Sequence, residues 1–102
     1  MPLIDISEED WLIVKSILEK NIPHLEVRAF GSRARRTSRR YSDLDLVVFA
    51  DAPLSLAVHA DITDDFSESD LPWKVDVAEW VSLSPEFRSA IAEDLVLVQQ
   101  AG

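Results

Sequence analysis

Two aspartates that alternate along an apolar segment have the types and spacing for metal chemistry. Asp43 comes directly before residues 44–49, and Asp45 is the one polar residue among them. In an extended strand their side chains point to the same face, roughly 6.5–7 Å apart along the chain. Two carboxylates held this close repel each other unless a cation lies between them. Oxygen-only ligands suit Mg²⁺ or Mn²⁺, so the spacing predicts a divalent metal site.

A third carboxylate belongs to the same candidate site. Asp76 lies between Val75 and Val77, in an alternating segment that predicts a strand over residues 74–79. If that strand lies beside residues 44–49, Asp76 joins the pair. Three carboxylates can hold two metal ions, one on a triphosphate and one that lowers the pKa of an attacking hydroxyl. Lys74 shares the face of Asp76 and either reaches a phosphate or forms a simple ion pair.

The segment before these aspartates has features of a phosphate site. Gly31 and Ser32 follow an alternating segment that predicts a strand over residues 25–30. A glycine there lets the backbone approach a phosphate, and Ser32 adds a hydroxyl donor. Arg33 and Arg36 would supply positive charge for the triphosphate oxygens. Together these four residues predict a nucleotide-binding segment.

The charge distribution agrees with a separation of metal and phosphate sites. The chain has 102 residues with ten Lys and Arg against nineteen Asp and Glu, a net charge of −9. Five of the ten basic residues fall within residues 33–40. The overall acidity argues against direct binding to nucleic acid, because duplex affinity depends on neutralising phosphates. A solvated basic surface is the alternative explanation of the cluster, but its place between Gly31 and the aspartates favours phosphate binding.

Helices and strands must alternate to position these residues. Helical periodicity and capping signals predict a helix over residues 8–20, a second opened by residues 51–53, and a third opened by residues 84–86. Residues 33–39 predict a short basic helical turn, and residues 95–98 a last edge strand. This order predicts an α/β (α+β) fold, a small sheet packed with helices, and the length suits a single domain over residues 1–102.

Several classes of protein are excluded by composition. The chain has no cysteine, which excludes a disulfide framework and thiolate metal sites. No apolar run approaches the ~20 residues of a membrane-spanning helix, and the N-terminus lacks the features of a signal peptide. We therefore expect a cytoplasmic protein with no membrane association.

At residues 31–35 and 42–46 the chain resembles the signature of the polymerase-beta-like nucleotidyltransferase superfamily. Within it, the resemblance is to the minimal nucleotidyltransferases (MNT proteins), and residues 66–76 resemble a subgroup of short MNT proteins. The resemblance implies a mixed sheet, and it implies a metal triad and two phosphate contacts: Asp43, Asp45 and Asp76 for the metal, and Gly31 and Ser32 for the phosphates. Many relatives have glycine where this chain has Arg36, which puts an extra side chain in the phosphate turn.

The resemblance also implies a partner and a reaction. MNT proteins pair with an all-helical HEPN-domain protein, often an RNase toxin, and transfer AMP from ATP to a tyrosine of that toxin. The expected activity is therefore that of a Mg²⁺-dependent adenylyltransferase and antitoxin in a hetero-oligomer. The nucleotide-binding sheet takes up 102 residues, so we expect the acceptor to come from a partner or from a second copy in a homodimer. Two alternatives remain open: a non-catalytic module that neutralises its partner by binding, and a subunit of a small-molecule nucleotidyltransferase.

Overall fold

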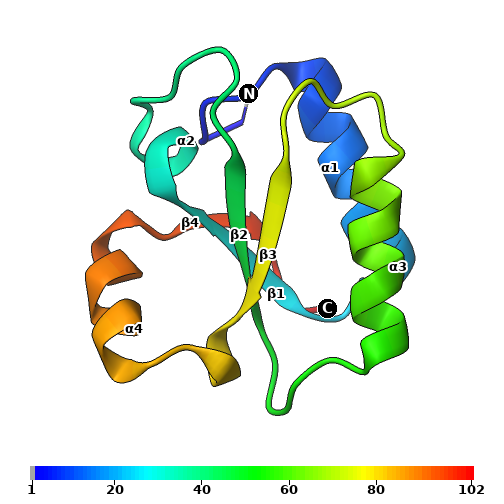
Figure 1. The fold of residues 1–102 in the computed structure, drawn as a ribbon, viewed down its shortest axis with the longest axis vertical. Helices are drawn as coiled ribbons and strands as arrows, with labels where there is room; N and C mark the ends of the chain where they lie inside the picture. Colours follow the sequence, from blue (N-terminus) through cyan, green and yellow to red (C-terminus); the bar gives the residue numbers. More distant parts are fainter. Residues whose placement is uncertain (1) are drawn as a thin grey trace.

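A four-stranded mixed sheet lies at the centre of the computed structural model, which describes residues 2–102 (Figure 1). Its strands are β1 (Glu26–Phe30), β2 (Leu44–Phe49), β3 (Val75–Glu79) and β4 (Val96–Gln99). They lie in the order β3-β2-β1-β4, and only the β2–β3 pair is parallel. The predicted α/β fold with a mixed sheet is confirmed, and the strands that carry Asp45 and Asp76 are neighbours.

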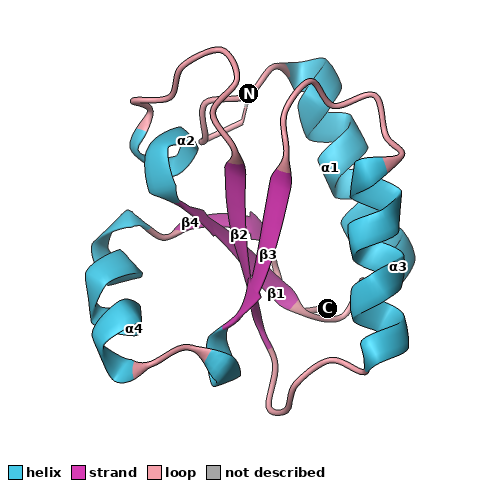
Figure 2. Cartoon of the chain, viewed as in Figure 1, coloured by secondary structure: helices cyan, strands magenta, loops and turns pink. Residues whose placement is uncertain are grey.

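Helices cover both faces of this sheet (Figure 2). The longer elements are α1 (Glu8–Asn21), α2 (Gly31–Arg35), α3 (Leu56–Ser67) and α4 (Pro85–Ile91), with short 3₁₀ turns η1 (Trp80–Ser82) and η2 (Ala92–Asp94). Figure 1 shows α1 and α3 side by side along one face, with α2 and α4 on the other side. Within residues 2–102, none of the helices combines the length and apolar character needed to cross a membrane.

Most element boundaries differ from the prediction by at most a single residue, but those of α2 and α3 differ by more. The second long helix begins at Leu56, since the Ser55 hydroxyl accepts a hydrogen bond from the Val58 backbone (3.2 Å) and so caps the helix there. The basic helical turn predicted over residues 33–39 is α2, which starts at Gly31 and ends at Arg35. The last strand extends to Gln99 and pairs with β1 at the edge of the sheet.

The alternation within β2 separates the hydrophobic core from the candidate site. Leu44, Leu46 and Val48 are fully buried and belong to the core beneath α1 and α3. Asp45 points to the opposite face, because successive side chains of a strand alternate. On that second face Phe30 packs edge-to-face on Phe87 of α4, with ring centroids 5.9 Å apart. The core thus fixes β2 from one side and leaves its carboxylate on the other.

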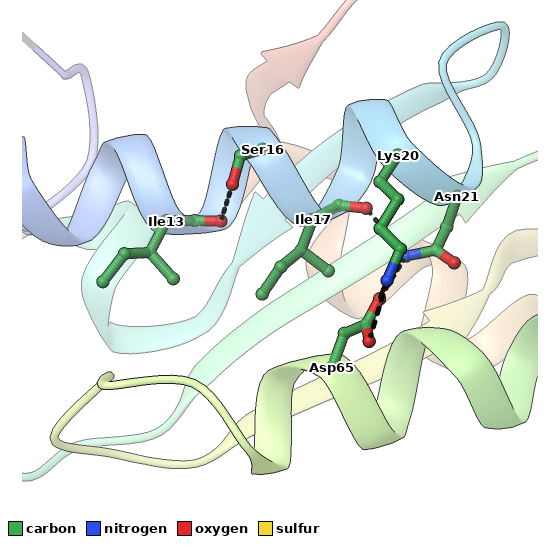
Figure 3. A network of polar contacts seen from close by, with 6 residues as sticks. All are labelled: Ile13, Ser16, Ile17, Lys20, Asn21 and Asp65. Atoms are coloured by element: carbon green, nitrogen blue, oxygen red, sulfur yellow. Dashed lines mark hydrogen bonds and ion pairs between the residues drawn. The ribbon is translucent and has the colours of Figure 1, made fainter.

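The two long helices are joined by a polar network at their ends (Figure 3). Asp65 of α3 accepts hydrogen bonds from the Asn21 amide (2.9 Å) and from the Lys20 ammonium (3.1 Å) of α1. Asn21 also donates to the carbonyl of Ile17 at 2.9 Å. These contacts lower the pKa of the Asp65 carboxyl, first through the Asn21 amide and then through Lys20. The network therefore fixes the position of α3 relative to α1.

We expect Asp65→Asn to lower the free energy of unfolding at neutral pH and to have little effect in acid. A carboxyl whose pKa is lower in the folded state stabilises the fold above its unfolded pKa of about 3.9, and this contribution disappears as the pH falls through the folded pKa. Urea unfolding of both proteins at about pH 7 and about pH 2 measures the difference. The exposed neighbour Asp64→Asn is the control, and equal losses at both pH values would contradict the prediction.

Candidate functional site

The three predicted carboxylates lie at one end of the two parallel strands. Asp45 of β2 and Asp76 of β3 are directly paired in the parallel ladder, and neighbouring strands lie about 4.8 Å apart. Asp43 comes just before β2 and is exposed. Asp45 is half-buried, and the Asp76 side chain is 49% exposed. The structure thus brings Asp45 and Asp76 together on one face, with Asp43 at the strand end beside them.

Electrostatic repulsion is concentrated on the middle carboxylate. Burial raises the pKa of the Asp45 carboxyl, and the charges of Asp76 and Asp43 raise it further. The charge of Arg35 acts in the opposite direction and lowers this pKa. The site therefore holds more negative charge than its surroundings neutralise.

This donor set fits a divalent cation. Carboxylate oxygens are the ligands that Mg²⁺ and Mn²⁺ prefer, and a bound cation would relieve the repulsion at Asp45. As the side chains stand within residues 2–102, three acidic or imidazole groups do not yet converge around one point. Asp45 and Asp76 lie side by side on one face of neighbouring strands, and a metal role for the three aspartates stays a prediction.

Gly31 lies directly against the middle carboxylate. It follows Phe30, which is the strand partner of Asp45, and its φ angle is +77°. A Cβ atom built on Gly31 would overlap the Asp45 Oδ2 atom and lie 3.4 Å from its Cγ. Both the backbone conformation and the close approach therefore require glycine at this position.

The Arg33 side chain is buried and makes several structural contacts. Its side chain is only 5% exposed. The guanidinium donates hydrogen bonds to the backbone carbonyls of Ser42 (2.9 Å), Asp5 (2.8 Å) and Arg40 (3.3 Å), and it stacks 4.2 Å from the ring centroid of Trp73. The contacts with Arg40 and Ser42 hold the loop that leads to Asp43, and those with Asp5 and Trp73 join this loop to two other segments. A phosphate contact by the Arg33 side chain stays a prediction.

Arg36 ends α2 in the left-handed conformation, with φ 61° and ψ 36°. Its backbone N–H caps the helix by donating to the carbonyl of Arg33, and its guanidinium donates to the carbonyl of Leu3 at 3.3 Å. This backbone conformation favours glycine at the end of a helix, which accounts for the glycine of many relatives. A phosphate contact by the Arg36 side chain stays a prediction.

We expect Arg36→Gly to be more stable than Arg36→Ala by about 1 kcal/mol, since only glycine adopts the left-handed conformation without a steric cost. Both variants lose the hydrogen bond to Leu3, so their difference isolates the backbone contribution. Denaturant unfolding of the two proteins measures it. Equal free energies of unfolding would contradict the assigned conformation.

Arg35 is a site residue that the sequence reasoning did not single out. Positions 31, 32 and 35 share one face of α2, because residues three and four apart lie on the same side of a helix. Arg35 is the basic residue whose charge lowers the pKa of Asp45, and its guanidinium is held by Asp94 of η2 at 3.0 Å. The helical spacing from Gly31 is the signal that would have selected Arg35 from the basic run.

The remaining polar residues at the site are accounted for by local contacts. Lys74 pairs with Asp76 at 3.4 Å, so the simpler of the two alternatives for Lys74 is the one observed. Both side chains are well exposed, and such a pair contributes little to stability. Ser32 is partly buried, and its backbone carbonyl accepts a hydrogen bond from the Thr37 N–H at 2.9 Å; a phosphate contact by its hydroxyl stays a prediction.

Comparison with known proteins places this arrangement in a family. The model of the family described as "Nucleotidyltransferase domain" matches residues 12–98, which include all three carboxylates. The chain belongs to the nucleotidyltransferase domain family. Its sequence is also 41% identical over 97 residues to the "Probable protein adenylyltransferase MntA" of Haemophilus influenzae, a match that covers 95% of this chain and 85% of that relative. The chain is thus a nucleotidyltransferase of the minimal, MntA-like type.

Solved structures share the nucleotidyltransferase fold. A toxin–antitoxin crystal structure with AMP-PNP matches with a TM-score of 0.73 and 24% identity, covering 89% of this chain and 73% of that one. A complex of a tri-AMPylated Shewanella oneidensis HEPN toxin with its MNT antitoxin matches with a TM-score of 0.69 and 20% identity, covering 93% and 73%. A structure assigned to a minimal nucleotidyltransferase matches with a TM-score of 0.67 and 28% identity, covering 94% and 95%. The sheet and helices of this nucleotidyltransferase therefore recur in proteins of diverged sequence.

Proposed function

We propose that this chain is a Mg²⁺-dependent adenylyltransferase that transfers AMP from ATP to a tyrosine hydroxyl of a HEPN-domain partner and so acts as its antitoxin. The observation that carries the proposal is the pairing of Asp45 with Asp76, beside Asp43 and against Gly31. The sequence similarity to an MntA protein named as an adenylyltransferase supports the reaction, and the HEPN toxin–MNT antitoxin complex of similar fold supports the partner.

The proposal gives each residue of the site a task. Asp43 and Asp45 would hold the metal ion, and Asp76 would hold metal and help to remove the proton of the acceptor hydroxyl. When bound, a divalent ion neutralises triphosphate charge and lowers the pKa of an attacking hydroxyl. Ser32 and the glycine backbone at position 31 would contact the phosphates, and Arg35 would add positive charge there.

The decisive experiment follows the AMP group. ATP labelled at the α-phosphate is incubated with Mg²⁺, this protein and its purified HEPN-domain partner, and label on the partner is located by mass spectrometry. Label on a tyrosine, abolished by the double substitution Asp43→Asn/Asp45→Asn, supports the proposal. An unlabelled partner that the double variant still neutralises would overturn it in favour of the binding module. Label on a small molecule instead would favour the second alternative, a subunit of a small-molecule nucleotidyltransferase.

We expect Arg35→Ala to raise the KM for ATP by about tenfold, which corresponds to the loss of one charge-assisted contact to a phosphate. The matched variant Asp94→Asn removes the residue that holds Arg35 in this structure and leaves the arginine free. It should therefore lower the KM for ATP or leave it unchanged. Steady-state labelling over a range of ATP concentrations measures both, and an Arg35→Ala enzyme with the wild-type KM would contradict the role given to Arg35.

A further inference from the structure

A pocket of about 410 Å³ lies beside the third carboxylate and has no role in the reaction so far described. It is formed by the end of α3 and by the loop that joins α3 to β3, drawn in yellow-green at the top of Figure 1. Five of its eight lining residues are apolar, and Thr63 lines it at an exposed position; the apolar residues are Phe66, Leu71, Pro72, Trp73 and Val75. The pocket has room for one large apolar side chain.

The pocket adjoins an edge of the sheet that can take a further strand. Among residues 2–102, β3 pairs only with β2, so its other edge carries no strand. Exposed strand edges accept extended peptide segments through backbone hydrogen bonds. Successive side chains of an added strand would alternate between the two faces of the sheet. One of them would enter the pocket next to Val75, and its neighbour in sequence would lie on the face of Asp76.

One wall of the pocket is connected by contacts to the loop that leads to Asp43. Trp73 stacks on the buried guanidinium of Arg33, which also holds the carbonyl of Ser42 just before Asp43. One side chain thus fixes both the wall of the pocket and the loop that carries the first carboxylate. A segment bound in the pocket would therefore have a fixed position relative to Asp43.

The charges around the pocket favour a basic occupant. Asp64, Glu68 and Asp70 are exposed and adjoin lining residues in the sequence, whereas Lys74 is the one basic residue in the lining. Lys74 is itself paired with Asp76. The surroundings of the pocket are therefore net negative, and a positively charged segment is complementary to them.

We propose that this pocket and the free edge of β3 dock the acceptor segment of the partner protein: an extended, basic segment with a large apolar residue directly beside the residue whose hydroxyl is modified. The proposal deepens the proposed function and rests on it for the identity of the acceptor. It adds the position of the acceptor segment, its charge, and the anchor residue next to the reacting hydroxyl.

The test fills the pocket from its exposed side. Thr63→Trp places a large ring in the pocket, and Leu56→Trp, at a 90% exposed position of the same helix, is the matched control. We expect Thr63→Trp to raise the KM for the HEPN-domain partner by about tenfold or more, the cost of losing a buried anchor, with an unchanged Kd for ATP. Leu56→Trp should change neither. A KM within twofold of the wild-type value for Thr63→Trp would overturn the docking proposal.

Binding measured without chemistry separates the two proposals. Calorimetric titration of the partner into the wild-type protein, Thr63→Trp and Leu56→Trp gives the Kd in the absence of ATP. If the wild-type protein binds the partner but transfers no label, the proposed function fails, and a weaker Kd for Thr63→Trp alone still supports the docking site. If Thr63→Trp and Leu56→Trp bind with the wild-type Kd, the docking proposal fails whether or not label is transferred. Increasing salt should weaken wild-type binding, because the contact is between opposite charges, and binding insensitive to salt would contradict the basic character assigned to the segment.

Discussion

The substitution Asp45→Asn should abolish transfer of AMP while leaving the protein at least as stable as the wild type. Removing one preorganised electrostatic group from an active site costs about 10²–10³-fold in rate, and a shared metal ligand should cost no less. The carboxylate is half-buried beside Asp76 and Asp43, and these surroundings raise its pKa. Because the ionised form is disfavoured in the folded protein, a neutral side chain of the same shape relieves repulsion.

Two measurements test this pair of effects. The rate of label transfer from ATP to the partner gives the activity, and denaturant unfolding at neutral pH gives the free energy of unfolding. Asp51→Asn, at an exposed position after β2, is the control and should leave both quantities unchanged. If Asp45→Asn transferred AMP at the wild-type rate, the Asp45 carboxylate would have no role in the reaction. A large loss of stability in Asp45→Asn would contradict the prediction, because it would mean that the charged Asp45 carboxylate stabilises the fold.

We expect Gly31→Ala to damage stability and activity more than the addition of one methyl group at any other position of the chain. The Gly31 φ of +77° costs about 1–2 kcal/mol for a residue with a Cβ. The new Cβ would also overlap the Asp45 carboxylate, which must then move. We expect a loss of stability of at least this size, together with a fall in transfer of about 10²-fold from the displaced carboxylate. Unfolding and label-transfer measurements on the same preparation give both numbers.

A double variant separates the two causes. In Gly31→Ala/Asp45→Ala the overlap with the carboxylate is gone, but the backbone strain remains. The loss of free energy caused by Gly31→Ala should therefore be smaller in the Asp45→Ala background than in the wild type, as a double-mutant cycle measures. Equal losses in the two backgrounds would mean that the close approach of position 31 to Asp45 carries no energy.

Local patterns in the sequence were sufficient for the elements and for the carboxylates. The alternation around Asp45 and Asp76 predicted two strands, and the structure pairs these two residues in one ladder. Capping residues such as Ser7 fixed a helix boundary, because a cap is a contact between residues near in sequence. The metal and nucleotide roles of these residues stay predictions.

The arginines could not be assigned from the sequence in the same way. Charge and proximity to Gly31 selected Arg33, but its guanidinium is held by a carbonyl at Asp5, in a segment that no local pattern connects to it. The helical spacing from Gly31 distinguishes Arg35, but its contact with Asp94, 59 positions away, is visible only in the tertiary structure. Side chains of one type in a short run differ mainly in the distant groups they meet, and only the tertiary structure determines those groups.

The position of β4 at the end of the sequence affects the order in which the sheet can form during translation. β1, a central strand, pairs on one side with β4, and the buried side chain of Gln99 donates to the carbonyl of Ile22, 77 residues away along the chain. Contacts between such distant positions form only after the intervening chain exists. A ribosome must therefore release residues 96–99 from its exit tunnel before β1 acquires both of its neighbours. The β1–β2 pair, which brings Gly31 against Asp45, can form earlier, so the sheet is completed last at its β4 edge.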